Sequence, residues 1–364
     1  MIELPDLASD IDARWLNSVL RESGRGLPPV ASLEMQRIGE GVGVLSEIYR
    51  LKLRYADGVD AGPSSLVVKI PPPVQPIRDL AASYGFYQRE VTFYRDLASQ
   101  VPMRSAVCYA AEFDPATQNF VLVLEDVCNA APGDQIAGLT LEQVRAAVDA
   151  LAALHASWWG RPELEALESV VQPFGMAPYH EFSARHGAAW DSFHPFLKDR
   201  ISPRMMEVGE KMSTWLDALI EEVLNGPRTL CHGDFRADNL MFETARDGSA
   251  SLIVLDWQIL TQGAGAFDLG YMMSGSVAPE LRRAHEMELL RGYHAKLLAG
   301  GVKDYDFDQC LLDYRRALLI GFTYAVQGGA PSDMSVPRMN ALITAMARRC
   351  DEAMQDHGLD AFVN

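Results

Sequence analysis

The chain has 364 residues, of which 48% are hydrophobic and 22% charged, an ordinary composition for a globular protein that builds its own core. The net charge of −17 weighs against a nucleic-acid-binding protein, which is expected to be basic. Most of the acid excess falls after residue 125; it could attract a cationic substrate, although overall charge speaks first to solubility. The five cysteines are scattered without a CxxC pair, so no disulfide framework or structural zinc site is predicted.

The N-terminal part of the chain is predicted to be rich in strands. A short helix begins it, with Asp10 as the expected N-cap of DIDARWLNSVLRES. The first residues are acidic and lack a long apolar run, so no secretory signal is expected and the protein is predicted to be cytoplasmic. Alternating apolar residues with glycine-rich breaks then predict three antiparallel strands, near 33–39, 44–55 and 65–70.

A proline-rich break and a helix precede the next pair of strands. The segment PPPVQP is expected to be neither helix nor central strand, because proline lacks the backbone N–H. A long helix is predicted from 78 to 99, and two short strands follow near 106–112 and 119–125. Residues 1–125 are therefore predicted to form a small lobe with an antiparallel sheet and one prominent helix.

Beyond residue 126 the pattern becomes mainly helical. Thr140 is the expected N-cap of a helix whose apolar stripe runs through LEQVRAAVDALAALHASWW. Further helices are predicted near 180–200, 203–225, 279–299, 306–327 and 335–356. Residues 126–364 are thus predicted to form a larger, mainly helical lobe, and the fold class is α+β.

Two segments, LCHGDFRADNL and LIVLDWQ, place acids beside short apolar strands. Asp234 could accept a proton from a hydroxyl group, and Asn239, five residues later, offers an amide oxygen suited to magnesium. Asp256 offers a second hard oxygen ligand, and the turn TARDGSA would bring it beside Asn239. Either acid alone could be a turn cap, but together with His232 the set favours a catalytic site.

The spacing HGDxxxxN, followed by strand, turn, strand and a second aspartate, resembles the protein-kinase-like fold, where protein kinases carry H-R-D-x-x-x-x-N and D-F-G. Gly233 stands where protein kinases have arginine, Asp256-Trp257-Gln258 replaces D-F-G, and no convincing A-P-E segment follows. The chain therefore resembles the small-molecule branch, the aminoglycoside phosphotransferase and choline kinase superfamily with its ecdysteroid-kinase-like members. It also resembles hydroxyacyl-CoA-kinase-like phosphotransferases.

The resemblance implies a bilobal protein-kinase-like fold and an ATP-dependent phosphotransferase that moves the γ-phosphate to a small-molecule hydroxyl. Asp234 would be the catalytic residue, and Asn239 and Asp256 would bind Mg²⁺. His232 and Asp268 would give the loop structural support, although Asp268 could equally be a plain helix cap.

The resemblance also predicts that a lysine ends the third strand and pairs with a glutamate on the following helix. Lys69 ends SSLVVKI, and Lys52 is the only other lysine before residue 126. Glu90 is the expected partner and Glu47 the less favoured one. The pair would hold a fixed cation on the nucleotide phosphates, whereas without it Lys69 and Glu90 would be ordinary surface charges.

Further contacts with the nucleotide are expected from two segments. IGEGVGVLSEIY would cover the phosphates through Gly39, Gly41, Gly43 and Ser46, although alone it reads as a hairpin turn. FVLVLEDV resembles the hinge between lobes, where adenine would meet the main chain of Glu125, Asp126 and Val127.

The acceptor is the open part of this prediction. Residues 174–196 are rich in aromatic residues and histidines, and either shape the substrate site or serve helix packing; His155 is expected to be a buried structural histidine. A hydroxyacyl-CoA or a steroid- or choline-like alcohol are alternative acceptors, and a non-catalytic nucleotide-binding protein or a protein kinase are alternative functions. No nucleic-acid or membrane partner is expected, and the oligomeric state is not predicted.

Overall fold

The computed structural model of the chain describes residues 3–39, 45–56, 62–177, 180–224, 226–244 and 250–359. It divides into two compact units. The first comprises Met1–Asn129 with Asp256–Ile259, and the second comprises Ala130–Leu255 with Leu260–Asn364. The first unit therefore extends slightly beyond the lobe expected from the sequence and takes in the short segment that contains Asp256.

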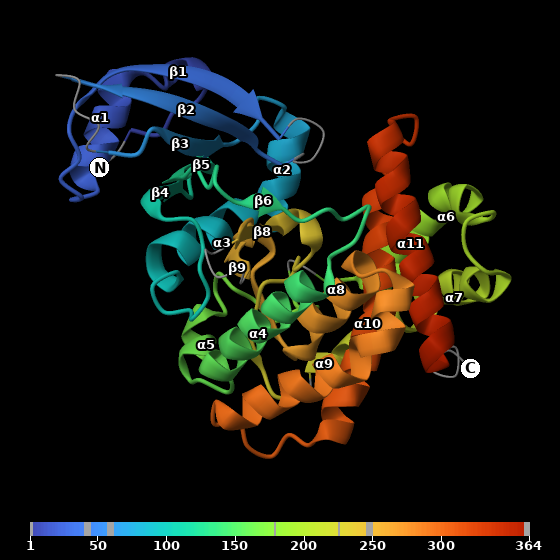
Figure 1. Cartoon of the computed structure of the whole chain (residues 1–364). Helices are drawn as coiled ribbons and strands as arrows, with labels where there is room; N and C mark the ends of the chain where they lie inside the picture. Colours follow the sequence, from blue (N-terminus) through green and yellow to red (C-terminus); the bar gives the residue numbers. More distant parts are fainter. Residues whose placement is uncertain are drawn as a thin grey trace. The chain divides into compact units, whose positions relative to one another are not determined.

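The first unit is built on an antiparallel sheet with the strand order β1-β2-β3-β5-β4 (Figure 1). The strands are β1 (Val30–Ile38), β2 (Glu47–Tyr55), β3 (Ser65–Ile70), β4 (Cys108–Asp114) and β5 (Asn119–Glu125). Side chains along β2 alternate between buried and more exposed positions, as expected for a sheet with one face against a core. The strands predicted from the sequence are confirmed, with ends shifted by a few residues.

Helix α1 (Ala13–Glu22) packs on this sheet. The prediction that Asp10 caps this helix is wrong: Asp12 accepts a hydrogen bond from the Trp15 N–H at 2.7 Å, while Asp10 accepts from the backbone of a preceding turn. The buried face of α1 shares a core with the inner side chains of the sheet, including Trp15, Leu16, Val19, Leu20, Leu51, Leu66 and Val68. Burial of these side chains holds α1 against the strands.

The single long helix predicted from 78 to 99 is wrong. The segment forms α2 (Gln75–Ser83) and α3 (Phe86–Thr92), separated at Gly85, whose φ of +67° lies in the left-handed region that favours glycine. The expectation that PPPVQP excludes a helix is also wrong at its end. Pro76 lies in the first turn of α2, where a missing N–H costs little because that turn has no helical acceptor.

A π-helical turn, Phe93–Leu97, continues from α3. The ring of Phe93 stacks on the indole of Trp257, with a centroid distance of 3.7 Å and an interplanar angle of 8°. Trp257 is fully buried and belongs to the first unit through the short segment Asp256–Ile259. The stack therefore ties the residue after Asp256 to the α3 region of the same unit.

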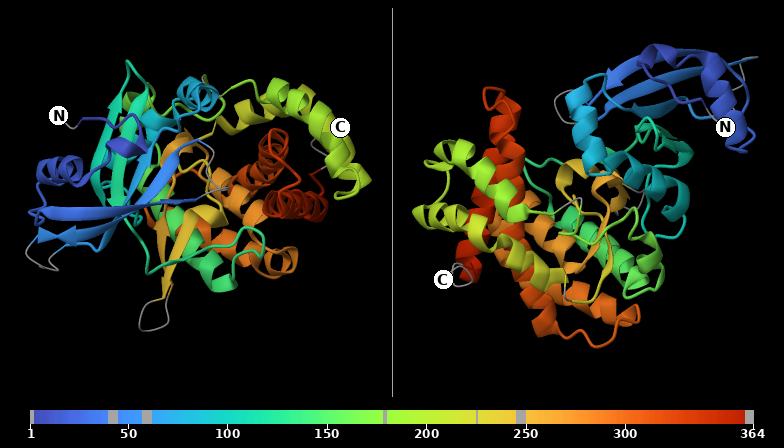
Figure 2. Two further views of the ribbon diagram at one scale, coloured as in Figure 1. Left: turned by 90° about the horizontal axis from the view of Figure 1, so that it is seen from above. Right: turned by 180° about the vertical axis from the view of Figure 1, so that it is seen from behind.

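The second unit is mainly helical (Figure 2). Both views show α6 and α7 side by side, and α8 is buried along its whole length. α10 packs closely on α8 at Gly270. A Cβ at this position would lie only 2.5 Å from Cβ of Ala317, so the packing leaves no room for a side chain. The helices of the second unit are α4 (Leu141–Trp158), α5 (Glu163–Leu167), α6 (Phe182–Leu197), α7 (Pro203–Leu224), α8 (Ala266–Ser276), α9 (Pro279–Ala299), α10 (Phe307–Gly329) and α11 (Pro337–His357).

Short strands of this unit lead into the two motif segments. β7 (Thr229–Cys231) pairs with β10 (Thr261–Gly263), and β6 (Ala131–Pro132), β8 (Leu240–Thr244) and β9 (Ala250–Val254) form a second small sheet. Thr140 caps α4 by accepting from the Gln143 N–H, as predicted. Among the described residues, no helix is both long and apolar enough to cross a membrane.

Candidate functional site

Lys69 is a buried cation held between two carboxylates of the first unit. Its Nζ lies 2.7 Å from Oε2 of Glu90 and 2.9 Å from Oδ1 of Asp256. β3 pairs with a strand on each side, which fixes the backbone that carries Lys69. Burial lowers the pKa of Lys69, but the carboxylates of Asp256 and Glu90 raise it by more, so that its pKa lies above the ordinary value and the amine stays charged.

Glu47, the less favoured partner for Lys69, has other contacts. It accepts a hydrogen bond from the Tyr49 hydroxyl at 2.7 Å and lies 3.0 Å from the guanidinium of Arg37. The helix glutamate rather than the strand glutamate therefore holds the lysine, and the alternative with Glu47 is wrong.

The carboxylate of Asp256 is the more accessible partner of Lys69. Its side chain is 29% exposed, whereas that of Glu90 is 2% exposed. Asp256 has a φ of +64°, a conformation that aspartate adopts more readily than most residues. Its Oδ2 also accepts from the Gln258 amide at 3.3 Å. A metal ion that approached the first unit at this point would meet Asp256 before Glu90.

The glycine-rich segment is only partly described. Gly39 follows β1 with a φ of +73°, Ser46 is buried directly before β2, and Gly41 and Gly43 lie outside the described residues. The hydroxyl of Tyr87, on the same helix as Glu90, donates to the Leu45 carbonyl at 2.7 Å. One helix therefore holds both the lysine partner and the end of this segment.

The side chains at the predicted hinge are used within the first unit. Asp126 accepts from Arg50 at 2.7 Å and from the Ser65 hydroxyl at 2.6 Å. Glu125 binds Arg104 at 3.0 Å, and its own N–H donates to the Val107 carbonyl. These contacts secure the end of β5 ahead of Val127 and suit a segment whose ligand contacts would come from the main chain.

In the second unit, Asp268 on α8 holds the start of the HGDFRADN segment. Its two oxygens accept from the backbone N–H groups of His232 at 2.7 Å and Gly233 at 2.9 Å. Gly233 has a φ of +83°, so the local backbone itself favours glycine there. Nε2 of His232 donates to the Leu255 carbonyl at 3.0 Å, and its Nδ1 accepts from the Asp234 N–H at 3.2 Å.

The carboxylate of Asp234 is oriented by three donors from its own unit. Oδ1 accepts from the Tyr271 hydroxyl at 2.9 Å, and Oδ2 accepts from the Asn239 amide at 2.9 Å and from Nε of Arg236 at 3.2 Å. The Asn239 amide also donates to the Asp234 carbonyl at 2.9 Å. The amide nitrogen of Asn239 is thereby committed to Asp234, which leaves Oδ1 as the atom suited to coordinate a metal.

Asn239 and Asp256 belong to different units, and the chain itself links them. The Leu255 N–H donates to the Asn239 carbonyl at 3.0 Å, and Leu255 directly precedes Asp256. β8 pairs with β9 antiparallel, with Leu240 opposite Val254. This pairing places Leu255 beside Asn239. The two predicted strands between the motifs are present, whereas residues 245–249 of the predicted turn TARDGSA lie outside the described residues.

Two residues that orient Asp234 were missed by the sequence reasoning. Arg236 is the one Lys or Arg inside HGDFRADN, and its charge between the two acids of that segment was a signal available in the sequence. It bridges Asp234 and Asp238, with Nη1 at 3.2 Å from Oδ2 of Asp238. Tyr271 lies far along the chain on α8, and no local pattern marks it.

One buried group, His155, Cys231 and Asp268, has the composition of a metal site among the described residues. Nε2 of His155 lies 3.3 Å from Asp268, and its Nδ1 lies 2.8 Å from the Tyr293 hydroxyl. Burial raises the pKa of the Cys231 thiol well above its ordinary value, which disfavours the thiolate that a metal requires. His155 is better described as hydrogen-bonded support for Asp268, whereas the Cys231 thiol donates to the Gly263 and Ala264 carbonyls. His155 is fully buried, as expected.

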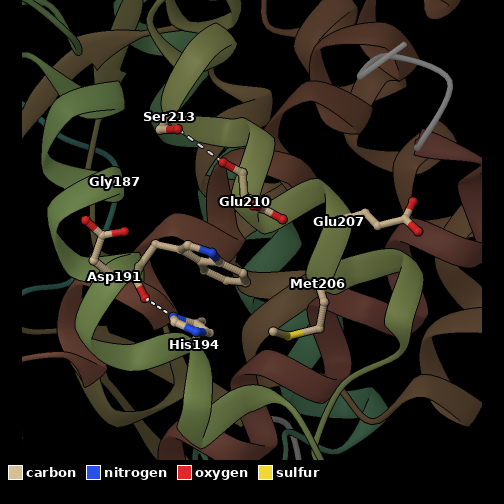
Figure 3. A pocket seen from close by; sticks show the side chains of 8 residues that line it. Gly187, Asp191, His194, Met206, Glu207, Glu210 and Ser213 are labelled. Atoms are coloured by element: carbon tan, nitrogen blue, oxygen red, sulfur yellow. Dashed lines mark hydrogen bonds between the residues drawn. The ribbon is translucent and has the colours of Figure 1, made fainter.

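A cavity of about 390 Å³ lies between α6 and α7 (Figure 3). The α6 part of its lining falls within the aromatic segment 174–196 that was considered for the substrate site. Three of the lining side chains are carboxylates. The lining residues are Gly187, Trp190, Asp191, His194, Met206, Glu207, Glu210 and Ser213.

An antiparallel sheet with a lysine–glutamate pair, joined in one chain to a helical unit with an HGDxxxxN loop, defines the protein-kinase-like fold in its small-molecule phosphotransferase form. The chain belongs to the ecdysteroid kinase-like family, whose model matches residues 40–303. The superfamily and the α+β fold class expected from the motifs are thereby confirmed. No curated protein sequence matches the chain.

Solved structures share this fold at low sequence identity. A putative aminoglycoside phosphotransferase from Ralstonia eutropha is 17% identical with a TM-score of 0.53, covering 93% of this chain and 96% of its own. The GDP complex of an aminoglycoside 2'-phosphotransferase of type IIIa is 13% identical with a TM-score of 0.53, covering 95% and 99%. A gentamicin complex of the type IIa enzyme APH(2") is 14% identical with a TM-score of 0.52, covering 97% and 99%.

Proposed function

We propose that this protein is a small-molecule kinase that transfers the γ-phosphate of ATP to a hydroxyl group. The observation that carries the proposal is the contact of Lys69 with both Glu90 and Asp256. A charged lysine beside an accessible carboxylate suits a phosphate chain that carries a divalent cation, because the amine meets phosphate oxygens and the carboxylate meets the metal. The family membership and the GDP-bound solved structures of the same fold support a nucleotide as donor.

In this proposal the donor is held mainly by the first unit. Lys69, steadied by Glu90, binds the phosphates that are not transferred, and Gly39, Gly41, Gly43 and Ser46 cover them. Adenine meets the main chain of Glu125, Asp126 and Val127. Asn239 and Asp256 supply oxygen ligands for Mg²⁺, and their amide and carboxylate oxygens fit its preference for hard donors. The metal, when bound, neutralises charge on the phosphate oxygens.

Asp234 orients the acceptor in this proposal. Its carboxylate accepts a hydrogen bond from the acceptor hydroxyl and takes the proton as the new oxygen–phosphorus bond forms. The bond between the γ-phosphorus and the bridging oxygen breaks, and ADP leaves with that oxygen. Asp268 and His232 hold the backbone around Asp234, which leaves its side chain little freedom to leave this position.

The charge of the acceptor is the finer part of the proposal. Asp191, Glu207 and Glu210 line the cavity between α6 and α7, and Trp190 adds an aromatic wall. Glu207 is paired with Arg204 at 2.7 Å. Carboxylates beside an indole favour an amine-bearing or neutral alcohol and disfavour an anionic hydroxyacyl thioester. We take this cavity as the acceptor site, and on that basis we place cationic and neutral alcohols ahead of acyl-CoA acceptors.

The experiment is a phosphorylation screen with ATP, and in parallel GTP, over aminoglycosides, choline-like amines, sterols and hydroxyacyl-CoAs. Product is detected by mass spectrometry, and Asp234→Ala protein serves as the control. A phosphorylated acceptor formed by the wild-type protein and absent with the variant supports the proposal. Nucleotide binding without product from any acceptor class would favour the alternative, a non-catalytic nucleotide-binding protein. Label that appears on protein instead would point to a protein kinase.

A further inference from the structure

Gln135 lies in the segment between β6 and α4, is fully buried, and has hydrogen bonds at both ends of its side chain. Oε1 accepts from the Ala237 N–H at 2.8 Å and from the Ser276 hydroxyl at 2.9 Å. Nε2 donates to the Gly275 carbonyl at 2.9 Å, and the Gln135 N–H donates to Oδ1 of Asp238 at 3.1 Å. One residue therefore binds both the backbone and a carboxylate in the middle of HGDFRADN, and joins them to the end of α8.

Arg349 on α11 fixes the backbone around Gln135. Its Nη1 donates to the carbonyls of Gln135 at 2.6 Å and Gly275 at 2.9 Å, and its Nη2 donates to the Ile136 carbonyl at 2.7 Å. Three carbonyl groups are thus bound by one buried guanidinium. The position of the Gln135 main chain is consequently set by α8 and α11 together, both of which belong to the same unit as the loop.

The segment also approaches the loop too closely for a side chain at Gly133. A Cβ there would lie 2.5 Å from the Ala237 carbonyl oxygen, closer than atoms can pack without a shift of the backbone. The Gly133 N–H donates to the Leu240 carbonyl at 2.8 Å. Gln135 therefore binds within the short 3₁₀ turn Ala237–Asn239, and Gly133 binds the residue that directly follows it.

We infer that Gln135 is a positioning residue for phosphoryl transfer, an inference that rests on the proposed function. Gln135 fixes the turn at 237–238, which lies between Asp234 and Asn239 in the chain. It thereby keeps the proposed acceptor-binding carboxylate of Asp234 and the proposed metal-binding amide of Asn239 at a constant relative position. Without the Gln135 amide, Ala237 keeps a bond to Ser276 at 3.0 Å but loses its second acceptor. Small displacements of catalytic groups reduce turnover more than they reduce ligand binding.

The test compares Gln135→Met with Gln262→Met in the full-length protein. Gln262 is a matched control, because it is also fully buried and its Nε2 donates to the carbonyls of Leu164 at 2.7 Å and Val171 at 2.8 Å. Methionine keeps the length of the side chain and removes the amide, so both variants lose buried hydrogen bonds. Hydrogen exchange of the segment 234–240 and steady-state kinetics are measured for each, with rates normalised to the folded fraction.

We expect Gln135→Met to exchange faster than wild type at 234–240 and to lower kcat by about 10-fold or more with KM for nucleotide within about 2-fold, on the scale seen when partners of site residues are removed. Gln262→Met should lose thermal stability without either effect. Unchanged exchange at 234–240, or an unchanged kcat despite faster exchange, would overturn the inference. Absence of turnover in the wild type would instead refute the proposed function, while the exchange comparison would still report on the role of Gln135 in the loop.

Discussion

The hydroxyl of Tyr271 donates to Oδ1 of Asp234 at 2.9 Å, while Asn239 and Arg236 donate to Oδ2. Each carboxylate oxygen therefore has a bound donor, and the plane of the carboxylate is set from two directions. Tyr271 comes from α8, the helix whose Asp268 also holds the backbone two residues before Asp234. A single buried helix thus orients both the main chain and the side chain of the proposed catalytic residue.

Replacing Tyr271 with phenylalanine removes one donor from Asp234 without emptying the space. We expect kcat to fall by about 10-fold with little change in KM for ATP. The variant loses a donor that orients the Asp234 carboxylate, but it keeps every residue proposed to bind the nucleotide. Tyr314→Phe is the matched control, since that buried hydroxyl binds the carboxylate of Glu286 instead. Equal loss of kcat in both variants would mean that the effect is general destabilisation.

Replacing Asp234 with asparagine tests the proton acceptor. The amide is close in shape to the carboxylate but cannot take the proton, so kcat should fall by about 10²- to 10⁴-fold while the Kd for Mg-ATP stays within a few-fold. Steady-state rates and calorimetric titration with Mg-ATP give the two quantities. Turnover near the wild-type rate would remove Asp234 from the mechanism.

Lys69→Met should weaken ATP binding and lower kcat together, because the amine is proposed to bind phosphates in both the ground state and the transition state. Lys52→Met is the control: Lys52 is exposed on the neighbouring strand β2 and is the only other lysine in residues 1–125. We expect a loss of at least about 10²-fold in kcat/KM at Lys69 and none at Lys52. A similar response of the two variants would show that net charge, rather than position, matters.

Asp256→Asn should raise the magnesium concentration needed for ATP binding. Asparagine tolerates the φ of +64° at this position and keeps one oxygen, but it removes the charge that would attract the cation. Calorimetric titrations of ATP at a series of Mg²⁺ concentrations should show half-saturation shifted upward by about 10-fold or more. Identical magnesium dependence in variant and wild type would exclude Asp256 as a ligand.

His186 makes stability sensitive to mild acid. It is fully buried, with Nδ1 2.9 Å from the Thr323 hydroxyl and Nε2 2.8 Å from the Gly209 carbonyl. Burial lowers the pKa of His186 below its ordinary value of 6.5, although the Gly209 carbonyl opposes this. Below pH 6.5 the unfolded chain therefore binds a proton that the folded protein excludes, and the free energy of unfolding falls as the pH drops toward the lowered pKa.

Thermal denaturation of wild type and His186→Gln from pH 7.5 to 5.5 measures this contribution. The variant should be less stable at neutral pH and should lose less stability on acidification than the wild type does. His180→Gln, at an exposed position, should keep the pH dependence of the wild type. Parallel curves for wild type and His186→Gln would show that His186 does not titrate in this range.

The elements that could be predicted are those with a local pattern. Apolar alternation marked the strands, and Thr140 marked the start of α4, because caps and periodicity act over a few residues. The two motifs marked Asp234 and Asp256 for the same reason. The break at Gly85 was also local, but a helical apolar pattern on both sides concealed it. Asp12 is the cap in place of Asp10, which shows that the sequence alone does not rank two acids lying two residues apart as caps.

The support around Asp234 could not be predicted in the same way. Gln135 and Ala237 are 102 residues apart, and Tyr271 lies 37 residues after Asp234, so their contacts depend on how the helices pack. A buried glutamine and a buried tyrosine leave no periodic trace in a sequence. Cooperative hydrogen-bond networks of this kind become visible only when the chain is folded.

The stacked rings of Phe93 and Trp257 give the protein an intrinsic spectroscopic signal that requires no added label. Coupled aromatic transitions in a rigid, chiral setting give near-ultraviolet circular dichroism, and this pair is 3.7 Å apart and adjoins Asp256 in the chain. The chain has six tryptophans, so the spectrum of a Phe93→Leu variant must be subtracted to isolate the pair. Binding events at Asp256 that tilt the indole could then be followed in solution with unmodified protein, whatever the acceptor proves to be.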